Sequence, residues 1–295
     1  MRQQEFISPA LSSPEGPVLL DNGDFLVVEM GADAGTVSRI DTKTGHCVRI
    51  VRTGRPNGLA VDASGVVWTA ESEHPSLLKV FPDGKTEVVL EGCDGVPFLF
   101  PNDLAFGSDG MLYMTDSGIK FENFSIDGEI RSDYATAFYN GKVFCIDPVT
   151  LKIELIDDGI KFANGIAIGP DDLLYVNETI TGNIYRYARI DGKYAGRTRQ
   201  LFGNVIHDDG KVYYRGPDGM KFSASGNLYC TVFGQGDVVV LDRNGKVVDS
   251  IVLGGKCPTN LVFGPEGSGD IYVTEGEKGR LEVHHVGEDG FALYR

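Results

Sequence analysis

Six short polar side chains, each at the start of one recurring phrase, carry oxygen atoms that could bind a cation. The phrase reads, for example, NGLAVDASGVVWTAES at residues 57–72 and NGIAIGPDDLLYVNET at residues 164–179. Carboxylate and carboxamide oxygens suit Ca²⁺, Mg²⁺ and Mn²⁺. If the fold brings the six together, two carboxylates supply the charge that the four carboxamides lack. The six leading residues are Glu15, Asn57, Asn102, Asn164, Asp218 and Asn260.

The spacing of these residues predicts how the chain is organised. Successive leading residues are 42, 45, 62, 54 and 42 positions apart, and each phrase reads as a strand, a turn and a second strand. Between the phrases lie further hairpin patterns with glycine-containing turns, such as LLKVFPDGKTEVVL. Six repeats of four strands are typical of a six-bladed β-propeller. We therefore predict an all-β chain with four antiparallel strands per blade, forming a single domain over residues 1–295.

Three segments need separate interpretation. RLEVHHVGEDGFALYR, residues 280–295, reads as a hairpin that supplies the third and fourth strands of the last blade. Residues 1–14 could add a closing strand or remain mobile. Residues 117–141 interrupt the regular spacing, and we predict a lid over the channel there, the alternative being an ordinary surface loop. The aromatic residues of this segment that could form a roof are Phe121, Phe124 and Tyr139.

The propeller predicts a central channel with a metal site. The first strand of each blade lines the channel, so the leading residues would surround one axis. Burying Glu15 and Asp218 there without a cation would cost several kcal/mol unless one of them took up a proton. The alternative is that these side chains merely satisfy turns and strand ends. We expect that structural role for a second recurring set, the carboxylates Glu29, Glu71, Asp116, Glu178 and Glu275 at the ends of the second strands.

Charge and composition exclude several classes of partner. The 295 residues carry a formal net charge of −15, and no run of Lys and Arg offers a basic patch, so nucleic acid and anionic membranes are poor partners. No apolar run is long enough to cross a bilayer, and MRQQEFISPALSS lacks the pattern of a secretory signal. The five cysteines are scattered without a CxxC pair, which predicts buried reduced thiols in a cytoplasmic protein. The sequence does not indicate an oligomeric state.

Several phrases together resemble the family of senescence marker protein, gluconolactonase and luciferin-regenerating enzyme. They are PEGPV (14–18), FPNDLAF (100–106), FANGIAIGPDDLLYVNET (162–179), RGPDGMKFSASGNLYCTVFGQGDVVVLDRNGKVV (215–248) and PTNLVFG (258–264). The resemblance implies one divalent cation held by Glu15, Asn164 and Asp218. It also implies that Asn102 lies beside the metal and faces the substrate. Ca²⁺ is the expected cation, with Mg²⁺, Mn²⁺ and Zn²⁺ as alternatives.

The activity that the resemblance implies is hydrolysis of a small lactone. A cation would polarise the carbonyl oxygen and lower the pKa of a water molecule, and Asp218 would act as the general base. The chain contains no Gly-x-Ser-x-Gly motif that would point to a serine hydrolase.

Two positions depart from the pattern of the mammalian aldonolactonases of that family. An Arg and a Glu that bind sugar hydroxyls there are matched here by Phe100 and, by ungapped count, Lys120. We therefore expect Asn102, Phe100 and Lys120 to face the substrate. Because Phe100 cannot bind hydroxyl groups as an Arg does, a substrate more apolar than a sugar lactone, or of different shape, is favoured.

Two other functions remain open on the sequence. Related propellers with a similar Ca²⁺ site hydrolyse phosphotriesters, and Asp218 would then act at phosphorus. A propeller can also serve as a binding module without catalysis, because fold alone does not establish function. Such a module would have no need for Glu15, Asn164 and Asp218.

Overall fold

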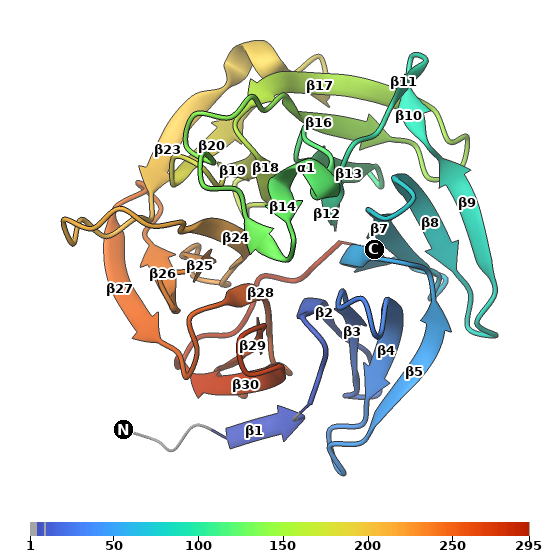
Figure 1. Ribbon diagram of the computed structural model, residues 1–295, viewed down its shortest axis with the longest axis vertical. Helices are drawn as coiled ribbons and strands as arrows, with labels where there is room; N and C mark the ends of the chain where they lie inside the picture. The colour runs from blue at the N-terminus through green and yellow to red at the C-terminus, as the bar shows by residue number, and fades with distance from the viewer. Residues whose placement is uncertain (1–4, 9, 295) are drawn as a thin grey trace.

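The computed structural model describes residues 5–8 and 10–294, which form six four-stranded antiparallel sheets around a central axis (Figure 1). Five of the six sheets follow the chain order from the axis outward, as propeller blades do. The predicted all-β fold with six blades of four antiparallel strands is therefore confirmed. The first three blades are β2 (Pro14–Leu19), β3 (Phe25–Glu29), β4 (Thr36–Ile40) and β5 (Cys47–Arg52); β6 (Pro56–Val61), β7 (Val67–Glu71), β8 (Ser76–Val80) and β9 (Thr86–Leu90); and β12 (Pro101–Phe106), β13 (Leu112–Asp116), β16 (Gly141–Ile146) and β17 (Ile153–Ile160).

The other three blades repeat this arrangement, and short hairpins decorate the loops. The blades are β18 (Ala163–Ile168), β19 (Leu174–Glu178), β20 (Asn183–Tyr187) and β23 (Gln200–Asn204); β24 (Gly216–Phe222), β25 (Leu228–Phe233), β26 (Asp237–Leu241) and β27 (Val247–Val252); and β28 (Pro258–Phe263), β29 (Asp270–Glu275), β30 (Arg280–His285) and β1 (Glu5–Ser8). The decorations are β10 (Gly92–Cys93) with β11 (Val96–Pro97), α1 (Phe121–Phe124), β14 (Ser125–Ile126) with β15 (Glu129–Ile130), β21 (Arg189–Ile190) with β22 (Lys193–Tyr194), and η1 (Gly196–Thr198). Neither helix in the described part of the chain has the length and hydropathy needed to span a bilayer.

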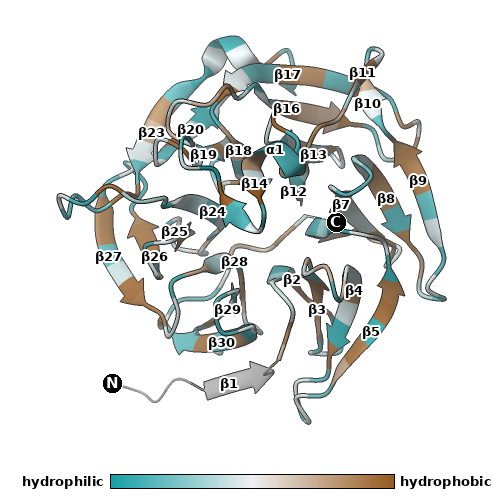
Figure 2. Cartoon of the chain, viewed as in Figure 1, coloured by the Kyte–Doolittle hydropathy of each residue, from teal (hydrophilic) through white to brown (hydrophobic). Residues whose placement is uncertain are grey.

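The hydrophobic core lies between blades rather than along the axis. Every residue of β6 is buried, whereas the outer strand β5 is largely exposed. One apolar cluster joins Trp68 of β7 to Phe106 of β12 and Phe144 of β16, so it fills the space between the second and third blades. The outer strands carry polar and apolar bands in alternation (Figure 2). The apolar faces of neighbouring blades are thus buried against each other, and this packing fixes the position of each inner strand.

The two ends of the chain close the ring in a way that differs from the expectation for residues 280–295. Among residues 280–294 of that segment, which the structure describes, only β30 is a strand, and the fourth strand of the last blade is β1, which pairs with β30. The predicted hairpin is therefore wrong in its second half, while the closing strand considered for residues 1–14 is present. The last blade combines strands from both ends of the chain, so its hydrogen bonds hold the ring shut.

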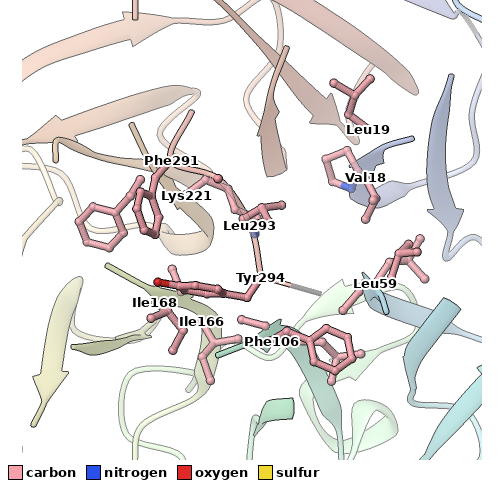
Figure 3. A pocket seen from close by; sticks show the side chains of 18 residues that line it. Val18, Leu19, Leu59, Phe106, Ile166, Ile168, Lys221, Phe291, Leu293 and Tyr294 are labelled. Atoms are coloured by element: carbon pink, nitrogen blue, oxygen red, sulfur yellow. The ribbon is translucent and has the colours of Figure 1, made fainter. Parts of the chain in front are cut away.

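Residues 286–294 run across the lower end of the channel, opposite the end at which the leading residues lie, instead of joining a sheet (Figures 1 and 3). The Asp289 carbonyl accepts a hydrogen bond from the Ala224 N–H, and the Phe291 N–H donates to the Phe222 carbonyl. Phe291 and Tyr294 then cap an apolar cavity of about 70 Å³. Its walls include Val18, Leu59, Phe106, Ile166 and Ile168, which come from four different inner strands.

Small residues after the leading residues let neighbouring inner strands approach closely. A β-carbon on Gly58 would lie 2.6 Å from the Asn102 carbonyl oxygen. One on Gly165 would lie 2.2 Å from the Asp218 carbonyl oxygen. No side chain fits at such distances without movement of the backbone. The leading residues Asn102 and Asp218 are therefore each packed against the main chain of the preceding blade.

In the last blade, the position directly after the leading residue holds Asn260. The sequence-based assignment of Asn260 as a leading residue is therefore wrong. The Leu261 N–H donates to Asn260 Oδ1 at 2.8 Å, just as the Leu104 N–H donates to Asp103 Oδ1 at 2.8 Å. Asn260 is therefore equivalent to Asp103, and Thr259 stands where the other blades have their leading residue. Sequence similarity alone aligned the polar residue one position too late.

The carboxylates at the ends of the second strands have the predicted structural role. Each accepts a hydrogen bond from a backbone N–H in the loop that leads into its own blade. The pairs are Glu29 with Ser12, Glu71 with Arg55, Asp116 with Leu99 and Phe100, Glu178 with Lys161, and Glu275 with Cys257.

The prediction of buried reduced thiols is confirmed only in part. All five cysteines are unpaired, but just Cys93 and Cys230 are buried.

The position of the C-terminal residues leads to a first prediction. Truncation after Gly290 should lower the free energy of unfolding by about 2–4 kcal/mol, because the half-buried rings of Phe291 and Tyr294 no longer cover the cavity. Thermal unfolding and binding of an apolar fluorescent dye measure the two effects. Leu293→Ala is the control, since this side chain is 55% exposed and should matter little. An unchanged melting temperature and no added dye binding would show that the segment closes nothing.

Candidate metal centre in the central channel

The six inner strands surround the channel in chain order, with β28 beside β2. Each begins at the same end of the channel, so the predicted ligands Glu15, Asn164 and Asp218 meet there although long stretches of sequence separate them. The structure brings Asn102 to the same end. Glu15, Asn102 and Asn164 are between 2% and 5% exposed, and Asp218 is partly buried. The Asn164 amide hydrogen-bonds the Asp218 carboxylate, which places two of the three side chains in contact.

Three buried side-chain oxygen atoms of the leading residues accept no hydrogen bond from any residue that the structure describes. They are Glu15 Oε2, Asn102 Oδ1 and Asn164 Oδ1. Buried acceptors are almost always satisfied in folded proteins, so three orphans in one place call for a positively charged or hydrogen-donating guest. Their chemistry is the all-oxygen set that hard divalent cations prefer. Within the described residues no three His, Cys, Asp or Glu side chains form a metal-binding group, so a cation at this centre depends on the carboxamides.

The electrostatics of the centre point the same way. Burial raises the pKa of Glu15 well above its usual value, and the nearby charges of Asp218 and Asp103 raise it further. Burial also raises the pKa of Asp218, against the opposing effect of the hydrogen bond from Asn164. Three carboxylates thus share a region with little solvent, and their ionised forms repel one another. A divalent cation would remove this repulsion and favour the ionised forms.

Asn102 is oriented by one hydrogen bond that leaves its oxygen free. Its Nδ2 donates to Ser117 Oγ at 3.0 Å, and Ser117 Oγ in turn donates to the Ala163 carbonyl at 3.0 Å. The side-chain amide is therefore fixed, and its Oδ1 remains an available acceptor.

Phe100 and Lys120 are associated with residues 117–141, since Phe100 packs against this segment and Lys120 belongs to it. Phe100 is 5% exposed, and its ring centroid lies 5.7 Å from that of Phe121 and 5.8 Å from that of Phe162. Lys120 directly precedes α1, and its Nζ lies 3.7 Å from a Glu122 carboxylate oxygen. The structure therefore puts Phe100 in an aromatic cluster and the Lys120 charge beside an acidic neighbour.

The segment 117–141 is a loop whose two ends meet. The Asn140 N–H donates to the Gly118 carbonyl, so the residues between them form a closed excursion with α1 and β14 near the centre of the ring (Figure 1). Its aromatic residues pack against Phe100 and Phe162, which directly precede β12 and β18. The segment is thus held above the start of two inner strands.

Sequence reasoning missed two residues at this end of the channel. The Tyr214 ring contacts Phe124 and Tyr134 of the excursion, and burial together with the Asp218 charge raises the pKa of Tyr214. The Arg55 guanidinium lies 3.4 Å from the centroid of the Phe121 ring. Both precede a leading residue by only a few positions, so a search of the loops before each phrase could have found them.

Comparison with known proteins decides the family. The chain matches the SMP-30/Gluconolactonase/LRE-like region over residues 14–277. The chain belongs to this family. The resemblance predicted from the sequence is therefore confirmed, and its match spans all six inner strands.

Relatives within and around the SMP-30/Gluconolactonase/LRE-like family include enzymes of two kinds. A gluconolactonase from Zymomonas mobilis is 30% identical over 89% of this chain and 76% of its own length. A diisopropyl-fluorophosphatase from Loligo vulgaris is 28% identical over 92% of this chain and 88% of its own. The solved structure of regucalcin from Agrobacterium tumefaciens, described as a calcium-binding protein, superposes with a TM-score of 0.78 at 17% identity. That alignment covers 99% of this chain and 97% of regucalcin, so the two share the fold.

The close approach of β18 and β24 in this family member gives a second prediction. Gly165→Ala would place a methyl group 2.2 Å from the Asp218 carbonyl oxygen and should cost about 1–3 kcal/mol of stability through overpacking. Gly276→Ala is the matched control, because its nearest neighbours would lie at 3.4–3.8 Å, which is ordinary contact. Urea unfolding of both variants measures the difference. Equal stability of the two variants would contradict the packing described for the inner strands.

Proposed function

We propose that this chain is a divalent-metal-dependent hydrolase that opens a small lactone. The observation that carries the proposal is the convergence of Glu15, Asn102, Asn164 and Asp218 at one end of the channel, with three buried oxygens lacking a partner among the described residues. Membership of the SMP-30/Gluconolactonase/LRE-like family and the similarity to a gluconolactonase support lactones as the substrate class.

Glu15, Asn164 and Asp218 would hold one divalent cation. Two carboxylates and a carboxamide match the preference of Ca²⁺ for oxygen ligands, and Mg²⁺, Mn²⁺ and Zn²⁺ are alternatives. The fold shared with a calcium-binding regucalcin supports Ca²⁺ as the first cation to test. When bound, the cation would polarise the lactone carbonyl and make a neighbouring water more acidic.

Asp218 is the proposed general base. Its carboxylate, kept ionised by the cation, would lie beside the water that the cation makes more acidic. It would take the proton from the attacking water as the new carbon–oxygen bond forms. The same proton would pass to the ring oxygen as the ester bond breaks, so that the product is a hydroxy acid and Asp218 is regenerated. The hydrogen bond from Asn164 holds the carboxylate in place for both transfers.

Asn102, Phe100 and Lys120 would shape the substrate site. Asn102 Oδ1 is free to accept a hydrogen bond from a hydroxyl group or from the water. Phe100 supports the aromatic underside of the excursion 117–141, which would act as a lid and exclude water. Lys120, at the start of α1, would meet the substrate only if the lid shifts. A roof of aromatic side chains favours lactones with apolar substituents over those rich in hydroxyl groups.

A phosphotriester is the second candidate substrate. The similarity to a diisopropyl-fluorophosphatase over 92% of this chain favours it, and the same four side chains would serve at phosphorus. A binding module without catalysis is the remaining alternative, and it would turn over neither class of compound.

Cation binding should stabilise the fold, which is the third prediction. Ca²⁺ at a hundred times its dissociation constant should add about 2.7 kcal/mol to the free energy of unfolding of chelator-treated protein. Glu15→Gln should abolish this gain, since it removes one of the two charged ligands. Glu29→Gln is the control, because Glu29 is equally buried in the same blade but binds Ser12, Ser38 and Arg49 instead. Differential scanning calorimetry measures each shift, and an equal gain in Glu15→Gln would remove Glu15 from the ligand set.

The fourth prediction concerns turnover. Chelated protein should be inactive in a pH-drop assay on γ- and δ-lactones, and one of the four cations should restore hydrolysis. Asp218→Asn should lower kcat by at least about 100-fold, because it removes the base and one charged ligand. Asp237→Asn is the control in the same blade, since Asp237 is 4% exposed and bonds to Ser250 and Gln235 away from the leading residues. Parallel assays with a fluorophosphate ester test the second candidate, and turnover of neither class with any cation would favour a binding module.

A further inference from the structure

In each of two successive blades, a side chain near the end of the second strand holds the main chain of the leading residue in the next blade. Thr115 Oγ1, directly before the end of β13, donates to the Asn164 carbonyl at 2.6 Å. Asn177 Nδ2, at the equivalent place in β19, donates to the Asp218 carbonyl at 2.5 Å. Both side chains are 0% exposed, so no water can replace these hydrogen bonds. The two proposed ligands thus depend on donors from the preceding blade.

A second pair of donors acts two residues further along the chain, directly after the same two strands. Ser117 Oγ donates to the Ala163 carbonyl at 3.0 Å, and Thr179 Oγ1 donates to the Pro217 carbonyl at 2.8 Å. Side chains two positions apart in an extended chain point to the same side, which explains why each pair reaches the same neighbour. The pairs are Thr115 with Ser117 and Asn177 with Thr179.

The geometry of these pairs has a specific consequence. The carbonyls of residues 163 and 164 belong to the two peptide groups that flank the Cα of Asn164, and those of residues 217 and 218 flank the Cα of Asp218. Holding both peptide groups fixes the backbone dihedral angles of the residue between them. The direction in which each ligand side chain leaves the strand is therefore set by the preceding blade. Glu15 has one such anchor, from Thr259 Oγ1 to the Pro14 carbonyl at 2.7 Å.

Asn177 departs from the threonines at the equivalent positions of the third, fifth and sixth blades, Thr115, Thr231 and Thr274. Thr231, in the following blade, donates to the Thr259 carbonyl at 2.8 Å just as Thr115 donates to Asn164. The longer Asn177 side chain makes the corresponding bond but leaves its own Oδ1 buried without a partner among the described residues. An unsatisfied buried acceptor destabilises the fold. Asn177 therefore lowers the local stability of the fold while it supplies a hydrogen-bond donor to the Asp218 carbonyl.

We propose that Thr115 with Ser117, and Asn177 with Thr179, are positioning residues that orient Asn164 and Asp218 for the cation. This inference rests on the proposed function, because it needs a cation at the channel centre. The competing interpretation is that these hydrogen bonds only join neighbouring blades. The two differ in what a substitution changes, since loss of a mere blade contact lowers stability alone.

Four conservative substitutions separate the interpretations. Thr115→Val and Asn177→Leu remove the donors with little change in volume. Thr69→Val is the matched control, because Thr69 is also 0% exposed but its Oγ1 donates at 3.1 Å to the Gly58 carbonyl within its own blade. Asn177→Thr restores a donor of the type used by the equivalent residues. Calorimetric titration with Ca²⁺ and thermal unfolding in chelator are measured for all four.

We expect Thr115→Val and Asn177→Leu to weaken Ca²⁺ binding by roughly 10- to 100-fold, the usual effect of losing a partner that orients a metal ligand. Thr69→Val should lower the melting temperature without a comparable change in affinity, and Asn177→Thr should bind nearly as well as the unmodified chain. Saturating Ca²⁺ should restore the kcat of Thr115→Val but not that of Asn177→Leu, because Asp218 is also the proposed base.

Each outcome decides between the interpretations. Equal losses of affinity in Thr69→Val and in the other variants, or no loss in any of them, would overturn the positioning role. If Asn177→Leu fails to fold, Thr115→Val and Asn177→Thr still give the comparison. Absence of Ca²⁺ binding and of any other cation binding by the unmodified chain would overturn the proposed function and this inference together. Normal binding by every variant would overturn the inference alone.

Discussion

The close approach of neighbouring inner strands at one end of the channel is the constraint on which the rest of the structure depends. At Gly58 and Gly165 the main chain of one blade touches the leading residue of the next so closely that a β-carbon has no room. This contact sets the distance between blades and the height of each leading residue on the axis. Side chains that are far apart in sequence can therefore share one buried space.

That shared space concentrates negative charge in an already acidic protein. Asp218 and Asp103 lie near enough to Glu15 for their charges to raise its pKa. Burial keeps water from screening these charges. The unfavourable interaction is tolerated because the cores between blades and the closing pair of β1 with β30 hold the ring together. The stability of the propeller thus supports a cluster of carboxylates that would not form in a less constrained chain.

The two ends of the channel have opposite character. The end with the leading residues is polar and lies beneath an aromatic excursion, whereas the lower end is apolar and is capped by Phe291 and Tyr294 (Figure 3). The inner strands change from polar to apolar within a few residues, as PNGLAV in β6 illustrates. Each inner strand therefore presents polar groups at one end of the channel and apolar side chains at the other.

The repeat of the sequence by itself determined the number of blades, the strands per blade and five of the six residues that lead the inner strands. It could do so because each phrase is a local strand–turn–strand pattern and closure of the ring follows from having six of them. Other features depended on contacts that no local pattern encodes. Among these are the alignment of Thr259 instead of Asn260, the use of β1 to complete the last blade and the donors from Thr115 and Asn177 to the next blade. Hydrogen bonds between distant segments decide such details, and only the folded chain brings those segments together.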